Sequence, residues 1–211
     1  MKLNIAEKDI QYFRRKVIQW GKANYRNFPW RSNKNIYHGL VAEIMLQRTK
    51  AEQAESIYSK FIKKYQSPSD FLKNPDKDLF KNLGLPERNR QFLDLNKRLS
   101  KTKIPQEKDL LLSLPGIGEY ISSAFLSLHL DKRAYLIDSN IIRVYGRFFG
   151  FEHNAETRRK KWFVSLANAM TPKRNHKFYN YSLIDFSRDM CRLKPLCQKC
   201  PMRKKCVYFS S

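Results

Sequence analysis

The chain has 211 residues, of which 42% are hydrophobic and 13% aromatic. This is enough to fill the core of one large domain or two small ones, and it excludes global disorder. The 42 lysine and arginine residues outnumber the 19 aspartate and glutamate residues, giving a net charge of +23. So basic a surface predicts a polyanionic partner, nucleic acid first and an anionic membrane surface second. No window approaches the roughly 20 apolar residues that a membrane span requires.

The hydrophobic pattern is helical almost throughout. Residues 1–22 show an amphipathic helical pattern with early acidic residues and no cleavage site, typical of neither a signal peptide nor a transit peptide. We therefore expect a soluble intracellular protein. After helical patterns in 41–46 and 54–62, further helices are expected at 87–102, 107–113, 118–130, 139–149, 156–171 and 178–190. The β-favouring run at 134–137 is too short to carry a sheet, so an all-α fold follows.

The segment Leu114–Tyr120 (LPGIGEY) places two glycines one residue apart between two expected helices. Gly116 and Gly118 permit a tight turn with positive φ. Such a turn leaves backbone N–H groups unpaired at the positive end of the next helix, which can bind a phosphate group. Taken alone, the pattern fits an ordinary corner between two helices equally well.

Two carboxylates stand beside apolar residues. Asp138 comes just before the apolar-periodic segment 139–144, where an aspartate ordinarily serves as a helix N-cap. Glu43 interrupts the apolar stretch 40–46, and its pattern alone fits a surface position on an amphipathic helix. In an apolar pocket, however, a carboxyl group has a raised pKa, as a general acid near neutral pH requires.

All four cysteines lie near the C-terminus, at Cys191, Cys197, Cys200 and Cys206. A disulfide scaffold would spread its cysteines through the chain, so this clustering predicts a metal centre. Four sulfur ligands suit zinc and a [4Fe–4S] cluster equally well on chemical grounds. The basic residues between the cysteines predict a phosphate-binding face, or a solvated surface that offsets the charge of the metal centre.

Together these motifs resemble the helix–hairpin–helix DNA glycosylases related to endonuclease III and MutY. The resemblance rests on LPGIGEY followed by DSNIIRV, and on four further segments in the family's order: 28–31, 43–49, 83–85 and 180–206. It implies an all-α, two-lobed fold. A six-helix barrel would cover 32–137, with the helix–hairpin–helix at about 107–130, and a cluster lobe would combine 1–31 with 138–211 around the cysteine loop at 191–206.

The resemblance also implies base-excision repair, in which a base is flipped out of duplex DNA and its N-glycosidic bond is hydrolysed. Asp138 matches the family's catalytic aspartate, which stabilises positive charge on the sugar and helps to position water. Glu43 matches an acid that protonates or orients the departing base. Tyr120 stands where members that also cut the backbone carry a lysine. Tyrosine cannot form a Schiff base, and Lys132 lies in an expected loop, so the resemblance implies a monofunctional enzyme.

Further residues are expected to contact DNA. Gln47 and Leu85 match wedge positions, which fill the gap left by the flipped base. Tyr37, Arg48 and Tyr120 are expected to line the base pocket or to contact the mismatch. Tyr120 is counted with Asp138 and Glu43 as an expected catalytic residue, and the other expected DNA contacts are Tyr37, Gln47, Arg48, Leu85, Gly116, Ile117 and Gly118.

Two substrate classes remain open: thymine or uracil opposite guanine, and adenine opposite guanine or 8-oxoguanine. MutY-type members ordinarily carry a further C-terminal domain, whereas this chain stops five residues after Cys206. Arg48 and the segment 84–89 also depart from the MutY pattern, so we expect thymine or uracil. A catalytically silent DNA-binding protein would need neither Glu43 nor Asp138, and a basic zinc protein on RNA is disfavoured because no sheet is expected.

The family's metal centre is a [4Fe–4S] cluster, but the gap between Cys191 and Cys197 is one residue shorter here than the family's usual spacing. We expect [4Fe–4S], with zinc as the alternative, in a structural and DNA-docking role without redox chemistry in base removal. The expected partner is double-stranded DNA with a mismatched or damaged base. We expect a monomer in the cytoplasm, associated with the nucleoid and not with a membrane.

Overall fold

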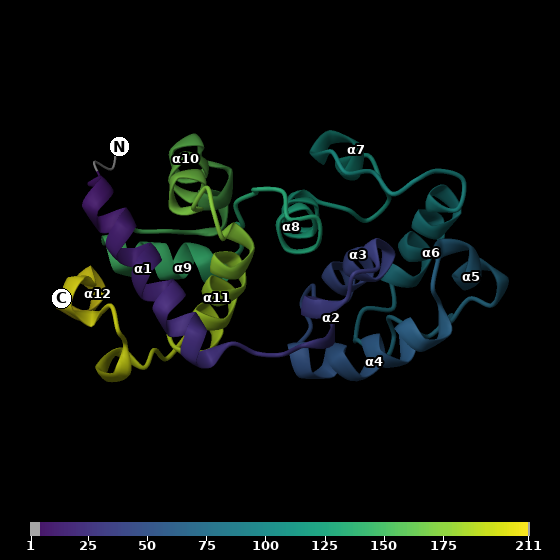
Figure 1. Cartoon of the computed structure of the whole chain (residues 1–211), viewed down its shortest axis with the longest axis horizontal. Coiled ribbons are helices and arrows are strands. Elements are labelled where there is room, and N and C mark those ends of the chain that lie inside the picture. Colours follow the sequence, from purple (N-terminus) through teal and green to yellow (C-terminus); the bar gives the residue numbers. More distant parts are fainter. Residues whose placement is uncertain (1–4, 211) are drawn as a thin grey trace. The chain divides into compact units, whose positions relative to one another are not determined.

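The computed structural model describes residues 5–210, which form helices joined by short turns, with no strand in this part of the chain (Figure 1). By its contacts the chain divides into two compact units. The central unit is Asn27–Leu130, and the terminal unit combines the described parts of Met1–Arg26 and Asp131–Ser211. These boundaries lie a few residues before those expected at 31/32 and 137/138.

The central unit is built around α3, which is buried on all sides from Tyr37 to Met45. Asn35 begins this helix by accepting hydrogen bonds from the backbone N–H groups of Tyr37 and His38. The π-helical turn η1 continues α8, and both pack against α3. The elements of this unit are α2 (Pro29–Ser32), α3 (Ile36–Met45), α4 (Ala51–Lys64), α5 (Pro68–Lys73), α6 (Arg88–Leu99), α7 (Lys108–Leu112), α8 (Glu119–Ala124) and η1 (Phe125–His129).

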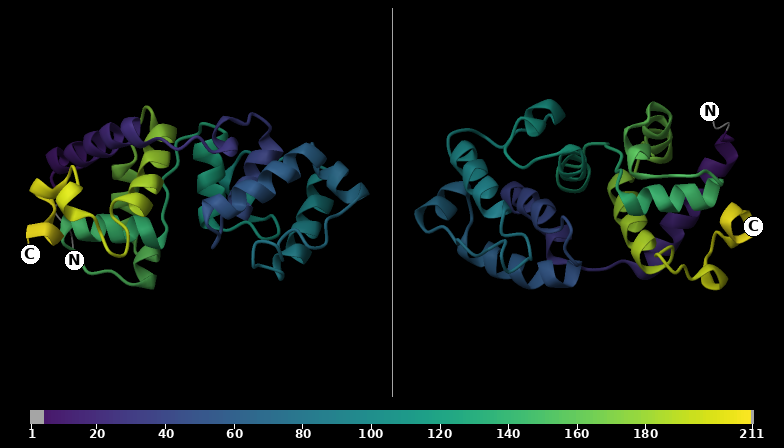
Figure 2. Two further views of the ribbon diagram at one scale, coloured as in Figure 1. Left: turned by 90° about the horizontal axis from the view of Figure 1, so that it is seen from below. Right: turned by 180° about the vertical axis from the view of Figure 1, so that it is seen from behind.

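The terminal unit joins the N-terminal helix to the C-terminal half of the chain. Its α1 packs along α11, so closely that a Cβ on Gly21 would collide with the side chain of Ser182. Both views of Figure 2 show the yellow C-terminal segment beside α9, consistent with the contacts between α12 and α9. Its elements are α1 (Glu7–Asn24), α9 (Ser139–Phe149), η2 (Ala155–Arg159), α10 (Lys161–Met170), α11 (His176–Asp189), η3 (Cys197–Lys199), η4 (Arg203–Lys205) and α12 (Val207–Ser210).

The expected all-α fold is confirmed, and several expected helices agree closely with observed ones. The helix expected at 139–149 is α9, and those expected at 87–102 and 107–113 are longer than α6 and α7 by one to three residues at an end. The run 134–137 forms neither a helix nor a strand. None of the helices formed by residues 5–210 combines the length and apolar character needed to cross a membrane.

Candidate active site

The hairpin between α7 and α8 belongs to the central unit. Gly116 has φ +75°, and the nearest neighbour of a Cβ there would be Gln91 Oε1 at 3.4 Å, so backbone conformation rather than crowding favours glycine. Exposed Gly118 is the N-cap of α8, whose first-turn N–H groups have no acceptor within the helix. Ile117 is buried and its N–H donates to the carbonyl of Leu114 at 3.2 Å, so its side chain anchors the hairpin rather than projecting from it.

Glu43 lies in the middle of α3, where only 2% of the residue is exposed. The alternative of a surface position is therefore wrong, because α3 is covered on every side. The carboxylate oxygen Oε1 lies 2.8 Å from Nε2 of His129, whose side chain is 3% exposed. A buried carboxylate paired with an imidazole can hold a charge or exchange a proton, the two abilities that general acid–base catalysis needs.

The turn that follows α3 carries Gln47 and Arg48. Exposed Arg48 has φ +58°, a left-handed conformation that costs a non-glycine residue about 1 kcal/mol or more. Gln47 Oε1 accepts a hydrogen bond from the guanidinium of Arg88 in α6, which also donates to the carbonyl of Ile44 at 3.4 Å. Burial lowers the pKa of Arg88; the negative charge of Glu87 acts in the opposite direction, and the positive charge of Arg48 lowers the pKa further. The expected wedge Gln47 thus lies in a basic cluster at the end of α3.

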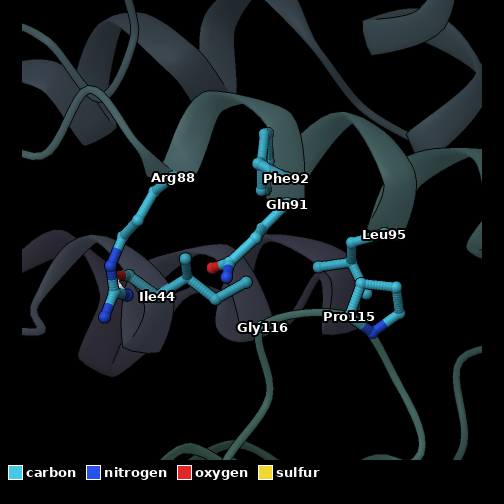
Figure 3. Close-up of a pocket in the computed structure, with 7 residues that line it drawn as sticks. All are labelled: Ile44, Arg88, Gln91, Phe92, Leu95, Pro115 and Gly116. Atoms are coloured by element: carbon cyan, nitrogen blue, oxygen red, sulfur yellow. Dashed lines mark hydrogen bonds between the residues drawn. The ribbon is translucent and has the colours of Figure 1, made fainter.

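A small pocket lies beside this cluster, within the central unit. Figure 3 shows Arg88 and Gln91 extending from α6 toward the end of α3 and the hairpin. The pocket therefore joins the hairpin glycine to the side chain that contacts Gln47. Its lining residues are Ile44, Arg88, Gln91, Phe92, Leu95, Pro115 and Gly116.

Like Ile117, the expected DNA contacts Tyr37 and Leu85 have buried side chains. Tyr37 is 3% exposed and its hydroxyl donates to Asn96 Oδ1 at 2.5 Å, which joins α3 to α6. Leu85, the second expected wedge, is 7% exposed and follows Gly84, whose φ is +74°. Both side chains pack in the core of the central unit, so packing accounts for them without DNA. Tyr120 is partly exposed in the first turn of α8.

Asp138, in the terminal unit, is the N-cap of α9. Its Oδ1 accepts the backbone N–H of Ile141 at 2.7 Å, and its Oδ2 accepts the amide of Asn140 at 3.2 Å. Burial raises the pKa of Asp138, while these hydrogen bonds and the positive charge of Arg143 act in the opposite direction. The N-cap interpretation is confirmed, and the same hydrogen bonds hold the carboxylate in a fixed orientation, as a catalytic group requires.

Arg143 links this carboxylate to the cysteine segment. Its guanidinium donates to Asn140 Oδ1 at 2.8 Å, to the carbonyl of Ser187 at 2.9 Å and to the carbonyl of Cys191 at 3.1 Å. Because Asn140 in turn donates to Asp138, one continuous set of hydrogen bonds runs from Asp138 to Cys191. In the sequence these residues lie in two separate segments, 138–143 and 187–191.

The four cysteines are free thiols in the terminal unit. Burial raises the pKa values of Cys191, Cys200 and Cys206, that of Cys200 to about 11, and in each case neighbouring cysteines raise it further. The four sulfur atoms are therefore near one another, although no group of three or more ligands within residues 5–210 is gathered closely enough to hold a metal ion. As a donor set, four soft sulfur atoms in one loop region fit a thiolate-bound metal group.

Four residues of the candidate site were not among those expected from the sequence: His129, Asn140 and Arg143 around the two carboxylates, and Arg88 beside Gln47. Asn140 and Arg143 lie within five residues of Asp138 on one helix, so the i, i+3 spacing of α9 was an available signal. For His129 no local signal exists, because its partner Glu43 is 86 residues away.

Comparison with known proteins identifies the family. A thymine/uracil-DNA glycosylase of Methanothermobacter thermautotrophicus is 32% identical over 201 residues, which cover 92% of this chain and 91% of that protein. The chain belongs to the thymine/uracil-DNA glycosylase family. It is thus a DNA glycosylase of base-excision repair, an enzyme that hydrolyses N-glycosyl compounds, as its resemblance to the helix–hairpin–helix glycosylases implied.

The solved structure of a thermostable thymine-DNA glycosylase is also similar, with a TM-score of 0.89 and 32% identity over 96% of this chain and 97% of that one. The fold is that of the helix–hairpin–helix glycosylases. An adenine DNA glycosylase of Buchnera aphidicola matches at 29% identity over 92% of this chain and 58% of its own length. No protein-family model matches the chain.

Proposed function

We propose that this glycosylase removes thymine or uracil opposite guanine from duplex DNA and leaves an abasic site without cutting the backbone. The observation that carries the proposal is the presence of both carboxylates, Glu43 and Asp138, in a chain whose relative at 32% identity is a thymine/uracil-DNA glycosylase. Glu43 is buried and paired, and Asp138 is held by several donors. Binding of DNA alone would require neither group.

The proposed reaction breaks the bond between C1′ of the deoxyribose and the base nitrogen, with the electron pair leaving on the base. Positive charge develops at the sugar, and the carboxylate of Asp138 stabilises it. A water molecule then supplies a hydroxyl group to C1′, and its other proton is released. Glu43 orients the departing base or gives it a proton, which it recovers from the solvent.

Tyr120 limits the reaction to base removal. Cleavage of the backbone by a covalent route needs an amine that attacks C1′ and forms a Schiff base. A phenol cannot do this, and Tyr120 stands at the start of α8 where a lysine would be required.

The proposed partner is duplex DNA with a mismatched base, bound by a monomer. The exposed glycines of the hairpin and the exposed Arg48 are suited to contact phosphate groups, and such contacts position a duplex without identifying its bases. With a net charge of +23, binding should weaken steeply as salt rises. Mismatch recognition is assigned to Gln47 and Arg48, while Tyr37, Leu85 and Ile117 support them from the core.

We also propose that Cys191, Cys197, Cys200 and Cys206 hold a [4Fe–4S] cluster. When bound, such a group would fix the fold of the C-terminal segment and present its basic residues to DNA, without taking part in base removal. Arg147 supports this segment by donating to the carbonyls of Arg192 at 2.7 Å and Leu193 at 3.0 Å. Elemental analysis of the purified protein should find iron and sulfide; zinc without iron would contradict the assignment.

The deciding experiment uses labelled duplexes that contain T·G, U·G, A·G, A·8-oxoguanine or an oxidised pyrimidine, each divided into samples with and without hot alkali. Strand breaks only after alkali, in the T·G and U·G duplexes, are the expected result. Breaks confined to the adenine duplexes would favour the MutY-type reaction. Breaks without alkali, or trapping by borohydride, would contradict the restriction to base removal, and no cleavage in any duplex would favour a DNA-binding protein without catalysis.

A further inference from the structure

The buried pair between Glu43 and His129 is the feature of the central unit that the proposed reaction leaves unexplained. The imidazole Nε2 lies 2.8 Å from Oε1, within hydrogen-bond distance, and both side chains are 3% exposed. Among the described residues, Oε2 of the same carboxylate has no hydrogen-bond partner. His129 therefore holds Oε1 of Glu43, while Oε2 is available to contact another group.

The fold builds this contact with two local adjustments. Gly39 lies one helical turn before Glu43 on α3, and a Cβ there would come within 2.7 Å of Cγ and Nδ1 of His129 and within 2.9 Å of its Cβ. Only a residue without a side chain leaves room for the imidazole at this point. Gly39 itself is not strained, so its role is to permit a close approach.

The second adjustment is the π-helical turn η1, which ends at His129. Here the N–H of Leu130 donates to the carbonyl of Phe125, five residues earlier, at 3.2 Å. A turn with one extra residue redirects the following side chains by about 100° relative to a regular α-helix. Phe125, Leu126 and Leu128 are buried in the same turn, so the helix keeps its apolar packing while His129 points to Glu43.

The chemistry of a buried carboxylate explains why such a partner matters. Without a donor, a carboxylate in the core is strongly destabilised and its side chain can rotate away from the productive position. Backbone N–H groups cannot serve, because those in the middle of α3 are used by the helix itself. Tyr58 lies close enough to Glu43 for the two to interact electrostatically, but within residues 5–210 the hydroxyl of Tyr58 is joined by a hydrogen bond to Asn33, from which it accepts at 3.2 Å, and not to Glu43.

We propose that His129 is a positioning residue for Glu43: by binding Oε1 through Nε2 it fixes the carboxyl group so that Oε2 serves the departing base. This inference rests on the proposed function, because it assumes that Glu43 acts in base release. Gly39 and the turn η1 are then parts of the same device, since they set the position of the imidazole.

The test measures single-turnover base release at saturating duplex, together with the dissociation constant of the same duplex. In His129→Leu the maximal rate should fall about 10-fold to 100-fold while the affinity for DNA stays unchanged. In His129→Gln, whose amide nitrogen can replace Nε2 as a donor to Oε1, most of the rate should return. The exposed histidine His153, replaced in His153→Leu, is the matched control and should keep the wild-type rate.

A second variant, Gly39→Ala, should displace the imidazole of His129 while leaving both Glu43 and His129 unchanged. Alanine is the better helix former, so a change in helix propensity alone would leave the rate unchanged. Displacement of the imidazole should instead slow base release as His129→Leu does. In the wild-type protein, the ¹⁵N resonance of His129 Nε2 should show a hydrogen bond that is lost in Glu43→Leu.

The results of these experiments distinguish failure of the proposed function from failure of the positioning role of His129. A wild-type chain that releases no base from any duplex overturns the proposed function and this inference with it. An active wild-type chain with normal rates in both His129→Leu and Gly39→Ala overturns the inference alone. The inference alone is also overturned if His129→Leu weakens DNA binding without slowing the maximal rate, or if His129→Gln is no faster than His129→Leu.

Discussion

The surroundings of Asp138 and those of Glu43 hold a carboxylate in two different ways. Asp138 stands at the beginning of α9, where backbone N–H groups are unused, and its donors, Ile141 and Asn140, come from the next three residues. Glu43 stands in the middle of α3, where every backbone N–H has a partner, and its hydrogen-bond partner is the side chain of His129, 86 residues away. Position within the helix decides which kind of support each carboxylate can receive.

This difference has consequences for both stability and function. The hydrogen bonds to Asp138 come from its own helix, so they form wherever α9 forms. The support of Glu43 requires the packing of α3 against η1 and the absence of a side chain at Gly39. Substitutions at Asp138 should therefore alter the chemistry and spare the fold, whereas changes near Glu43 should also report on packing.

The largest effect is expected for Asp138→Asn. Without a carboxylate to stabilise the developing positive charge, base release should slow on the order of 10³-fold. Asparagine still accepts the N–H of Ile141 as an N-cap, so the free energy of unfolding at neutral pH should be equal or higher. Single-turnover kinetics and thermal unfolding check this, with the exposed Asp189→Asn as control. Activity close to that of the wild type would remove Asp138 from the mechanism.

Glu43→Gln should have the next largest effect, a loss of about 10²-fold in the rate of base release. The amide can keep a hydrogen bond to His129, so thermal unfolding should change little, whereas Glu43→Leu should lose both the rate and the polar contact. Rates and melting temperatures of the two variants, measured side by side, separate chemistry from packing. If both variants keep full activity, Glu43 is a structural residue only.

Arg143→Met tests whether the hydrogen bonds around Asp138 reach beyond α9. It removes donors to Asn140 and to the carbonyls of Ser187 and Cys191, so the free energy of unfolding should fall by about 2–3 kcal/mol. Base release should slow about tenfold because Asn140 loses its orientation. Arg147→Met, which loosens the cysteine segment without touching Asn140, should alter the rate less. Equal rates in the two variants would show that Asp138 is positioned by its own helix alone.

The smallest effect is expected in how the rate of base release and the free energy of unfolding depend on pH. Burial raises the pKa of Asp138, so base release should decline on acidification at a pH above the ordinary aspartate value of about 3.9. Because the folded state holds this proton more tightly than the unfolded chain, ionised Asp138 lowers the free energy of unfolding. Asp138→Asn should thus gain stability relative to the wild type as pH rises through the folded-state pKa, and this gain should vanish below the unfolded-state value. Parallel denaturant titrations across this range measure the difference.

Those parts of the candidate site that depend on residues close together in the sequence could be predicted. The N-cap role of Asp138 follows from its place before an apolar-periodic segment, and positive φ at Gly116 follows from two glycines between helices. For Tyr37, Leu85 and Ile117, sequence matches indicated positions near DNA, yet all three side chains are buried. A match to a position does not reveal whether the side chain faces solvent, since that depends on the neighbouring helices.

The sequence by itself determined the all-helical fold and the separation of Asp138 from the hairpin, because helical periodicity and turn residues are local properties. It also determined that residue 120 is a tyrosine, whose side chain carries no amine, and that four thiols lie in one loop region. Only the tertiary structure decided the surroundings of Glu43. Its burial on all sides, the close approach at Gly39 and the direction of His129 arise where α3 meets η1, and no pattern within either segment encodes that contact.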